Sequence, residues 1–105
     1  MAMKKMKIRA WTAGDRVTVK AILFHPMETG QRKDKSTGET IPAHFITEVK
    51  CEHLQKNVLT CLWGPGVSKN PFISFKFKGA RKGESVKISW VDNQGQSDSM
   101  TAAIG

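Results

Sequence analysis

Apolar and polar residues alternate with a period of two along most of the chain. The alternation is clearest in residues 17–24 (VTVKAILF), 73–78 (ISFKFK) and 86–91 (VKISWV). Successive side chains of a β-strand point to opposite faces of the sheet, so this pattern predicts strands with one buried face. No helical stripe of useful length accompanies these segments, and the pattern therefore predicts an all-β chain.

Turn signals rich in Gly, Asp and Asn separate the alternating segments. About seven strands are predicted, and they cover residues 5–11, 16–25, 43–53, 57–63, 71–78, 84–92 and 96–104. Seven short strands in about 100 residues are typical of an immunoglobulin-like antiparallel β-sandwich. The sequence has no internal repeats, so we expect one immunoglobulin-like domain over residues 1–105.

One connection between predicted strands is unusually long. Residues 26–42 hold two prolines, two glycines and a cluster of charges, and no strand or helix pattern. A connection of this length without its own structure exceeds the usual loop, and such loops are often functional or disordered. The stretch HPMETGQRKD, residues 25–34, is therefore a candidate functional segment. The alternative is a structural loop that packs on its own sandwich.

The chain is strongly basic. Seventeen Lys and Arg residues against nine Asp and Glu give a net charge of +8. This balance favours polyanions, anionic small molecules or an acidic partner, and the alternative is an ordinary solvated surface. No apolar run is long enough to span a membrane. The basic residues 1–9 precede no apolar segment, so no secretory signal is predicted; this favours the cytoplasm, or export with a signal-bearing partner.

Candidate metal ligands are few and scattered. They are His25, Met27, His44, Cys51, His53 and Cys61. The two cysteines, ten residues apart, fit no zinc or CxxC pattern. A copper sandwich protein would cluster Cys, His and Met in one late loop, but the last 44 residues contain no Cys or His. The sequence therefore predicts neither a metal site nor a cofactor.

A catalytic thiol is also not favoured. Cys51 and His53 would lie on one face of a strand with their β-carbons about 7 Å apart, which is long for direct contact between nucleophile and base. The sequence contains no nucleophile elbow, zinc-protease motif or phosphate-binding loop. We therefore expect no enzymatic activity from this chain.

The pairing of the two cysteines depends on one turn. A two-residue turn at Leu54-Gln55 would set Cys51 opposite Val58 and place Cys61 on the other face, which forbids a disulfide between them. A longer turn centred on Lys56 would instead set the two cysteines opposite each other. The first register predicts that Cys51 and Val58 share one face, which would be the core face if Val49 and Leu62 also point inward.

In that register, the other face of the same hairpin is also apolar. The residues on it are Ile46, Leu59, Cys61 and Trp63. Apolar residues on both faces of a hairpin indicate a covered surface, and a partner subunit is the simplest cover. The four residues are therefore a candidate partner interface. The alternative is that Trp63 folds back on its own Gly-Pro-Gly loop.

Nucleic-acid binding is the alternative function that the charge suggests. Phenylalanines 72, 75 and 77 are interleaved with basic residues between positions 76 and 82, as on sheets that bind single strands. Phe75 and Phe77 also fit the inward alternation of a core strand, however. No RNA-recognition or KH motif occurs, so a core role for these two side chains is the better interpretation.

Four segments together resemble one family. The segments are HPMETGQRKD (25–34), Ile41-Pro42, SKNPFISFKF (68–77) and ISWVDNQG (88–95). Their order and spacing are similar to those of the SoxZ family. This family is the Z subunit of the SoxYZ sulfur carrier complex of thiosulfate oxidation. The resemblance covers about residues 5–104. Phe72 stands where family members often have Tyr, and Cys61 is not part of the family pattern.

The resemblance implies a non-catalytic scaffold with an immunoglobulin-like fold. It implies a heterodimer with a SoxY-type subunit, whose flexible Gly-Gly-Cys-Gly-Gly tail carries sulfur intermediates on its cysteine. It implies transient contact with other Sox enzymes and a periplasmic location, reached by export with the signal-bearing partner. Cys61 could then form a disulfide to a partner.

On this basis we expect the long connection to be a docking loop for the carrier tail or for Sox enzymes. Its candidate residues are His25, Pro26, Met27, Glu28, Gly30, Arg32, Lys33 and Asp34. Arg32 and Lys33 would attract the anionic cargo. His25, Pro26 and Gly30 would fix the path of the loop, because proline restricts φ and glycine permits a positive φ.

Overall fold

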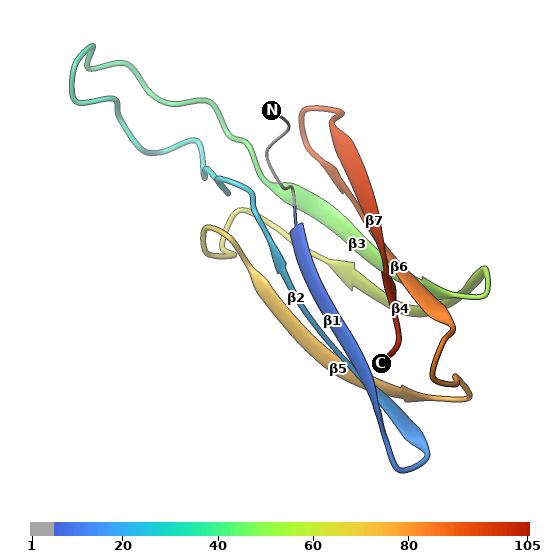
Figure 1. The fold of residues 1–105 in the computed structure, drawn as a ribbon. Coiled ribbons are helices and arrows are strands. Elements are labelled where there is room, and N and C mark those ends of the chain that lie inside the picture. The colour runs from blue at the N-terminus through green and yellow to red at the C-terminus, as the bar shows by residue number, and fades with distance from the viewer. Residues whose placement is uncertain (1–5) are drawn as a thin grey trace, which may run out of the picture.

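The computed structural model describes residues 6–105, which form seven strands and no helix (Figure 1). The strands are β1 (Met6–Ala13), β2 (Arg16–Leu23), β3 (Ile46–His53), β4 (Lys56–Leu62), β5 (Phe72–Lys78), β6 (Ser85–Asp92) and β7 (Ser97–Ala103). Each predicted segment overlaps one of these strands, although β1 continues beyond its predicted end at residue 11 and β4 begins one residue before its predicted start; the all-β prediction is confirmed. Residue 5, the predicted start of the first strand, lies outside the described residues. Within residues 6–105 there is no helix long and apolar enough to cross a membrane.

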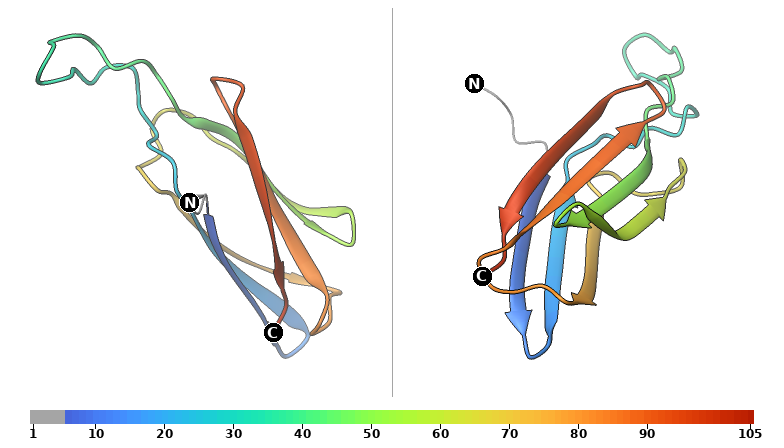
Figure 2. Two further views of the ribbon diagram at one scale, coloured as in Figure 1. Left: turned by 45° about the horizontal axis from the view of Figure 1, so that its top comes forward. Right: turned by 90° about the vertical axis from the view of Figure 1, so that its right-hand side faces the viewer.

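The strands form two antiparallel sheets that pack face to face, as expected for an immunoglobulin-like sandwich (Figures 1 and 2). One sheet has the order β1-β2-β5 and the other the order β4-β3-β6-β7. The core consists of the inward alternating residues of both sheets, including Val19, Val49, Ile88 and Trp90. Phe75 and Phe77 also point inward and pack on this core, as the alternation predicted.

The two edges of the sandwich differ. On one side a parallel bridge joins Ala10 of β1 to Ile104, the residue that follows β7. The Gly105 amide donates to the Ala10 carbonyl at 2.9 Å and closes this edge further. On the other side β4 and β5 are the last strands of their sheets, and no strand of the described chain lies between them. The edge between β4 and β5 is therefore open.

The β3–β4 hairpin corrects the predicted register. The two-residue turn is confirmed, because His53 pairs with Lys56 and both Leu54 and Gln55 have positive φ. A bulge then inserts one extra residue into β4, so that Cys51 faces Leu59 rather than Val58.

The side chain of Asn57 supports this bulge, because its Oδ1 accepts the Leu59 amide at 3.2 Å. The one-residue shift turns Leu59 and Cys61 to the inner face, and Leu62 points outward with 77% of its surface exposed. The prediction that Cys51 and Cys61 lie on opposite faces is therefore wrong. Both cysteines are free thiols.

The long connection is not structureless, which also corrects the prediction. Residues 26–44 form an extended hairpin that projects from one end of the sandwich (Figures 1 and 2). Isolated bridges pair Glu28 with His44 and Lys33 with Thr40. Gly30 has φ +88°, and a Cβ there would lie 3.1 Å from the Ala43 Cβ on the opposite limb. Glycine thus allows both the turn of the backbone and the close approach of the two limbs. We call residues 26–44 the projecting hairpin.

Candidate functional site

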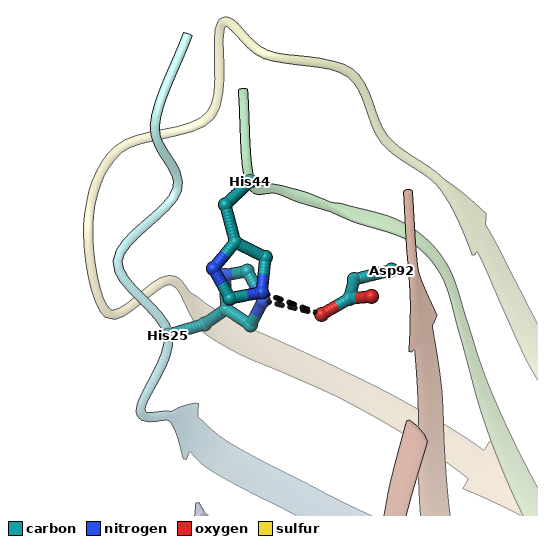
Figure 3. Close-up of side chains that lie close together, drawn as sticks. All are labelled: His25, His44 and Asp92. Carbon is teal, nitrogen blue, oxygen red and sulfur yellow. Dashed lines mark hydrogen bonds and ion pairs between the residues drawn. The ribbon is translucent and has the colours of Figure 1, made fainter. Parts of the chain in front are cut away.

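Three polar side chains meet where the projecting hairpin joins the sandwich (Figure 3). His25 follows β2, His44 precedes β3 and Asp92 ends β6, so the three come from distant parts of the chain. The Asp92 Oδ2 lies 3.1 Å from His25 Nε2 and 2.8 Å from His44 Nε2. The side chains of His25 and Asp92 are 3% and 0% exposed, whereas that of His44 is 22% exposed. We call these three residues the hairpin-base cluster.

The Asp92 carboxylate is fully engaged. Its Oδ2 accepts from the two histidines, and its Oδ1 accepts the amides of Gln94 and Gln96 at 3.0 and 2.8 Å. Burial alone would raise the pKa of Asp92, but the hydrogen bonds from His25, Gln96, His44 and Gln94 together lower it below its usual value. The carboxyl is therefore held in its charged form inside the protein.

The tautomer of His25 follows from its neighbour. The Met27 amide donates to His25 Nδ1 at 3.2 Å, so Nδ1 carries the lone pair and Nε2 carries the proton that Asp92 accepts. Met27 adopts a positive φ of 52°, and its Sδ accepts the Ile46 amide at 3.3 Å. The strained backbone is thus held by contacts on both sides.

The three side chains could in principle hold a metal, because their ligand atoms lie within 4.8 Å of one another. A metal on His25 Nε2 would require the proton to move to Nδ1, where it would face the Met27 amide. Metal-binding histidines usually donate this second N–H to an acceptor, and here a donor occupies that place. The geometry therefore favours a hydrogen-bonded cluster over a metal centre.

Two asparagines fix the base of the hairpin from neighbouring loops. The side-chain Oδ1 of Asn70 accepts the backbone N–H of His25 at 3.1 Å, and the backbone N–H of Asn70 donates to the His25 carbonyl at 3.0 Å. The Asn93 side chain accepts the Phe45 amide at 2.8 Å and donates to the Ala43 carbonyl at 2.9 Å. Three loops at one end of the sandwich are therefore joined around the hairpin-base cluster.

Farther along the hairpin, the residues predicted to form the docking loop lie in different environments. Pro26 is exposed, and Glu28 forms a bidentate pair with Arg32, whose Nη2 lies 2.9 Å from Glu28 Oε2. The hydrogen bond from Arg32 lowers the pKa of Glu28, and this pairing offsets part of the positive charge that was expected to attract cargo. Lys33 is exposed, and Asp34 accepts the Ser36 amide in the turn at 2.8 Å.

The eight predicted loop residues therefore do not form one surface. His25 and Met27 are buried at the base, whereas Lys33 lies toward the tip. A hollow of about 360 Å³ lies between these regions, lined by residues that include Glu28, Arg32 and His44. A docking role for the hairpin stays a prediction.

The open edge carries a second candidate surface. A groove of about 520 Å³ runs between β4 and β5 and is lined mainly by the apolar residues Leu59, Cys61, Trp63, Val67, Pro71, Phe72, Ile73 and Phe75. Three predicted interface residues, Leu59, Cys61 and Trp63, lie together in this groove. The fourth, Ile46, is fully buried in the core and cannot contact a partner, because a register shift between Ile46 and Glu48 in the pairing of β3 with β6 turns Ile46 to the same face as Val49. We call this surface the β4–β5 groove.

Neither thiol is poised for reaction. Burial, followed by the nearby charge of Glu52, raises the pKa of Cys51 to about 12. Burial also raises the pKa of Cys61. His53, the predicted neighbour of Cys51, directs its Nε2 to Glu84 Oε1 at 3.0 Å instead. Both thiols are therefore protonated near neutral pH, and a protonated thiol is a weak nucleophile.

The sequence did not reveal the cluster, because the segment Asp92-Asn93-Gln94-Gly95 is typical of a turn and does not indicate a buried carboxylate. The position of Asp92 at the end of the strand containing Trp90 was a usable signal, since ends of neighbouring strands meet at one end of a sandwich. His44 was considered only as a scattered metal ligand. Its place beside Pro42, just before a strand, gave no indication of its partner.

The fold and site define an all-β immunoglobulin-like domain with a hydrogen-bonded projecting hairpin and one open apolar edge. The family model described as sulphur oxidation protein SoxZ matches residues 6–103, nearly the whole chain. The chain therefore belongs to the SoxZ family, as the sequence resemblance predicted, and its role lies in sulfur oxidation. No curated protein matched the chain.

Proposed function

We propose that this chain is the non-catalytic scaffold subunit of a sulfur carrier complex. It pairs with a SoxY-type protein, and the cysteine on the tail of that partner carries sulfur intermediates during thiosulfate oxidation. Membership of the SoxZ family supports this role. The scaffold supplies a rigid base from which a flexible tail can reach successive enzymes.

The β4–β5 groove is the observation that carries the proposal. Its lining is apolar, and Leu59, Cys61 and Trp63 are only partly buried in the isolated chain. Leaving such surface in water is costly at about 25 cal/mol per Å², so covering it would stabilise a complex. The opposite edge, in contrast, is closed by the Ala10–Ile104 bridge. The SoxY-type subunit would therefore cover the β4–β5 edge.

The thiols and the central carboxylate of this chain support a non-catalytic role. A sulfur carrier needs a thiolate, but the pKa of Cys51 is about 12 and burial also raises the pKa of Cys61. Four hydrogen bonds engage Asp92, the carboxylate of the hairpin-base cluster. The sulfur chemistry would then belong to the partner's tail and to the enzymes that it visits.

The projecting hairpin would be the part of the scaffold that these enzymes or the tail contact. Lys33 is exposed and extends a positive charge away from the sandwich, whereas the charge of Arg32 is shared with Glu28. Thiosulfate-derived cargo is anionic, so Lys33 would attract it weakly over the Debye length of about 10 Å. The complex would act in the periplasm, where the signal of the partner would take both subunits.

Co-expression of this chain with the SoxY-type polypeptide from the same source tests the proposal. Size exclusion with light scattering should give a stable one-to-one complex. Leu59→Glu, which places a charge in the groove, should abolish the complex, whereas Thr60→Glu on the outer face of the same strand should leave it intact. Circular dichroism of each variant would separate loss of binding from loss of folding.

The two outcomes that contradict the proposal are distinct. Separate species for the unaltered chains would mean that no carrier complex forms. An intact complex with a folded Leu59→Glu chain would place the partner elsewhere on the scaffold.

A further inference from the structure

The outer face of the β1-β2-β5 sheet is uniformly basic. The alternation of each strand places six cations on it, namely Lys7, Arg9, Arg16, Lys20, Lys76 and Lys78. Among the described residues, the outward positions of these three strands include no Asp or Glu. Asp15, in the β1–β2 turn, lies 3.6 Å from Lys78 Nζ at one end of the face. We call these six residues the basic face.

The outer face of the other sheet is balanced by contrast. Its outward charged residues on β3 and β6 are Glu48, Lys50, Glu52 and Lys87, two of each sign. Lys50 Nζ lies 3.2 Å from Glu48 Oε1, so even these charges are partly paired. The positive charge of the sandwich is therefore concentrated on one sheet, and it is not an even property of the solvated surface.

Concentrating six like charges on a small sheet has an electrostatic cost. Cross-strand neighbours such as Arg9 and Lys20 lie directly opposite each other, an arrangement that is destabilising for like charges. A partner surface bearing carboxylates would remove this repulsion and would be steered toward the face during association. The face is thus complementary to a strongly acidic partner.

The aromatic residues decide which kind of acidic partner fits. Stacking of nucleic-acid bases needs free aromatic faces, but Lys20 Nζ lies 5.8 Å from the centroid of the Trp11 ring and occupies one side of it. Phe72 is exposed on the far strand, whereas Phe75 and Phe77 point into the core. The sheet therefore has no row of neighbouring free rings along which bases could stack.

The face also contains an apolar hollow of about 180 Å³. Lys7, Arg9 and Lys20 border it, and Ala21, Ile22 and Phe72 complete its lining. Cations around an apolar and aromatic floor are typical of protein interfaces, in which Arg and aromatic residues are enriched. An acidic side chain beside an apolar one would satisfy both parts of this hollow.

We propose that the basic face is a docking surface for the acidic surface of a second protein. This docking involves the outer face of the β1-β2-β5 sheet, whereas the groove lies at the β4–β5 edge; the two surfaces meet at Phe72, which lines both. The docking does not depend on the identity of the subunit that fills the groove. The negative partner surface would pair with the six cations and place an apolar side chain in the hollow.

Titration with poly-L-glutamate of about 20 residues tests this inference, because the peptide presents carboxylates without aromatic bases. The full chain, labelled with ¹⁵N, would be titrated in about 20 mM salt while amide chemical shifts are recorded. We expect shifts concentrated on β1, β2 and β5 near Arg9, Lys20 and Phe72. Shifts spread evenly over both sheets, or confined to the projecting hairpin, would overturn the proposal.

Two charge-reversal variants with the same change in net charge provide the control. Arg9→Glu with Lys20→Glu should weaken poly-L-glutamate binding at least tenfold, whereas Lys50→Glu with Lys87→Glu on the balanced sheet should weaken it less than threefold. Equal losses would mean that only net charge matters, and would overturn the proposal. Both variants change exposed positions, and their folding would be checked from the dispersion of the same spectra.

A single-stranded oligonucleotide of 20 thymidines distinguishes the two classes of polyanion. Because Lys20 covers part of the Trp11 ring, Trp11→Ala should change its binding less than twofold. Oligonucleotide binding that is tighter than peptide binding and lost in Trp11→Ala would assign the face to nucleic acid instead.

Peptide binding by the carrier complex provides the last test. The proposal expects the complex to bind the peptide as the chain alone does. Binding by the lone chain that disappears in the complex would mean that the subunit partner occupies the basic face, which overturns docking by a second visiting protein.

Discussion

The hairpin-base cluster and the β4–β5 groove are both assembled from residues distant in the sequence, yet they are opposite in character. The cluster is polar and buried, and its central carboxylate accepts four hydrogen bonds from its own chain. The groove is apolar and partly exposed, and its residues lie between two strands that have no neighbour on that side. A polar site that satisfies itself is part of the architecture, whereas an apolar surface left open indicates a missing partner.

The largest effect should come from removing the centre of the cluster. Asp92→Ala would leave His25, His44 and two backbone amides without their acceptor, so we expect a loss of about 3 kcal/mol or more in the free energy of unfolding. Urea denaturation of the isolated chain would measure it. The exposed control Asp15→Ala should change the stability by less than about 0.5 kcal/mol. Equal stabilities of the two variants would contradict the architectural role of Asp92.

A substitution in the groove should show the reverse behaviour, with a large effect on the affinity for the partner subunit and a small effect on the stability of the fold. Trp63 is partly buried in the isolated chain, and Trp63→Ala should weaken the carrier complex by about 2 kcal/mol, roughly 30-fold, if it anchors the interface. Calorimetric titration of the two subunits would give this value. Trp11→Ala, a tryptophan on the basic face, should leave the subunit affinity unchanged. A similar loss in both variants would mean that the groove is not distinguished from the rest of the surface.

The pH dependence of stability should further distinguish the hairpin-base cluster, which contains a buried carboxylate, from the apolar β4–β5 groove. Since the pKa of Asp92 is lowered in the folded chain, its contribution to stability is present above its unfolded pKa of about 3.9 and is lost as pH falls through the folded pKa. Denaturation between about pH 2 and pH 6 should therefore show stability falling on the acid side. Asp92→Asn should flatten this dependence, although Glu84, whose pKa is also lowered, will retain part of it. An identical acid slope in the two chains would contradict the role given to Asp92.

The alternation of apolar residues was sufficient to predict the seven strands and the sandwich. It was insufficient for the register of β3 and β4, because the Asn57 side chain supports a bulge that no periodicity reveals. A shift of one residue exchanges the two faces of a strand, so the predicted outer surface became the lining of the groove. Leu59, Cys61 and Trp63 lie together in this lining, whereas Ile46 lies in the core because of a separate register shift between Ile46 and Glu48 in the pairing of β3 with β6.

The projecting hairpin and its base were harder to predict. The hairpin pairs through isolated bridges whose residues show no apolar alternation, so its sequence resembles an unstructured loop. The cluster joins His25 and His44 to Asp92 across 67 and 48 residues, and their contact depends on three strands ending at one point. Such a contact is a property of the topology and cannot be obtained from local spacing.

The smallest effect concerns the reactivity of the two thiols, and it would sharpen the contrast between core and groove. Cys51 is fully buried with a pKa of about 12, so it should react with a maleimide only as fast as the chain unfolds. Cys61 lines the groove and is partly exposed, so it should react in the free chain, though more slowly than an unhindered thiol because burial raises its pKa. The carrier complex should protect Cys61 if the partner covers the groove. Mass spectrometry of labelled peptides over time would follow both sites. Equal labelling of Cys61 in the free chain and the complex would place the partner outside the groove, and rapid labelling of Cys51 would show that the core opens more readily than its packing implies.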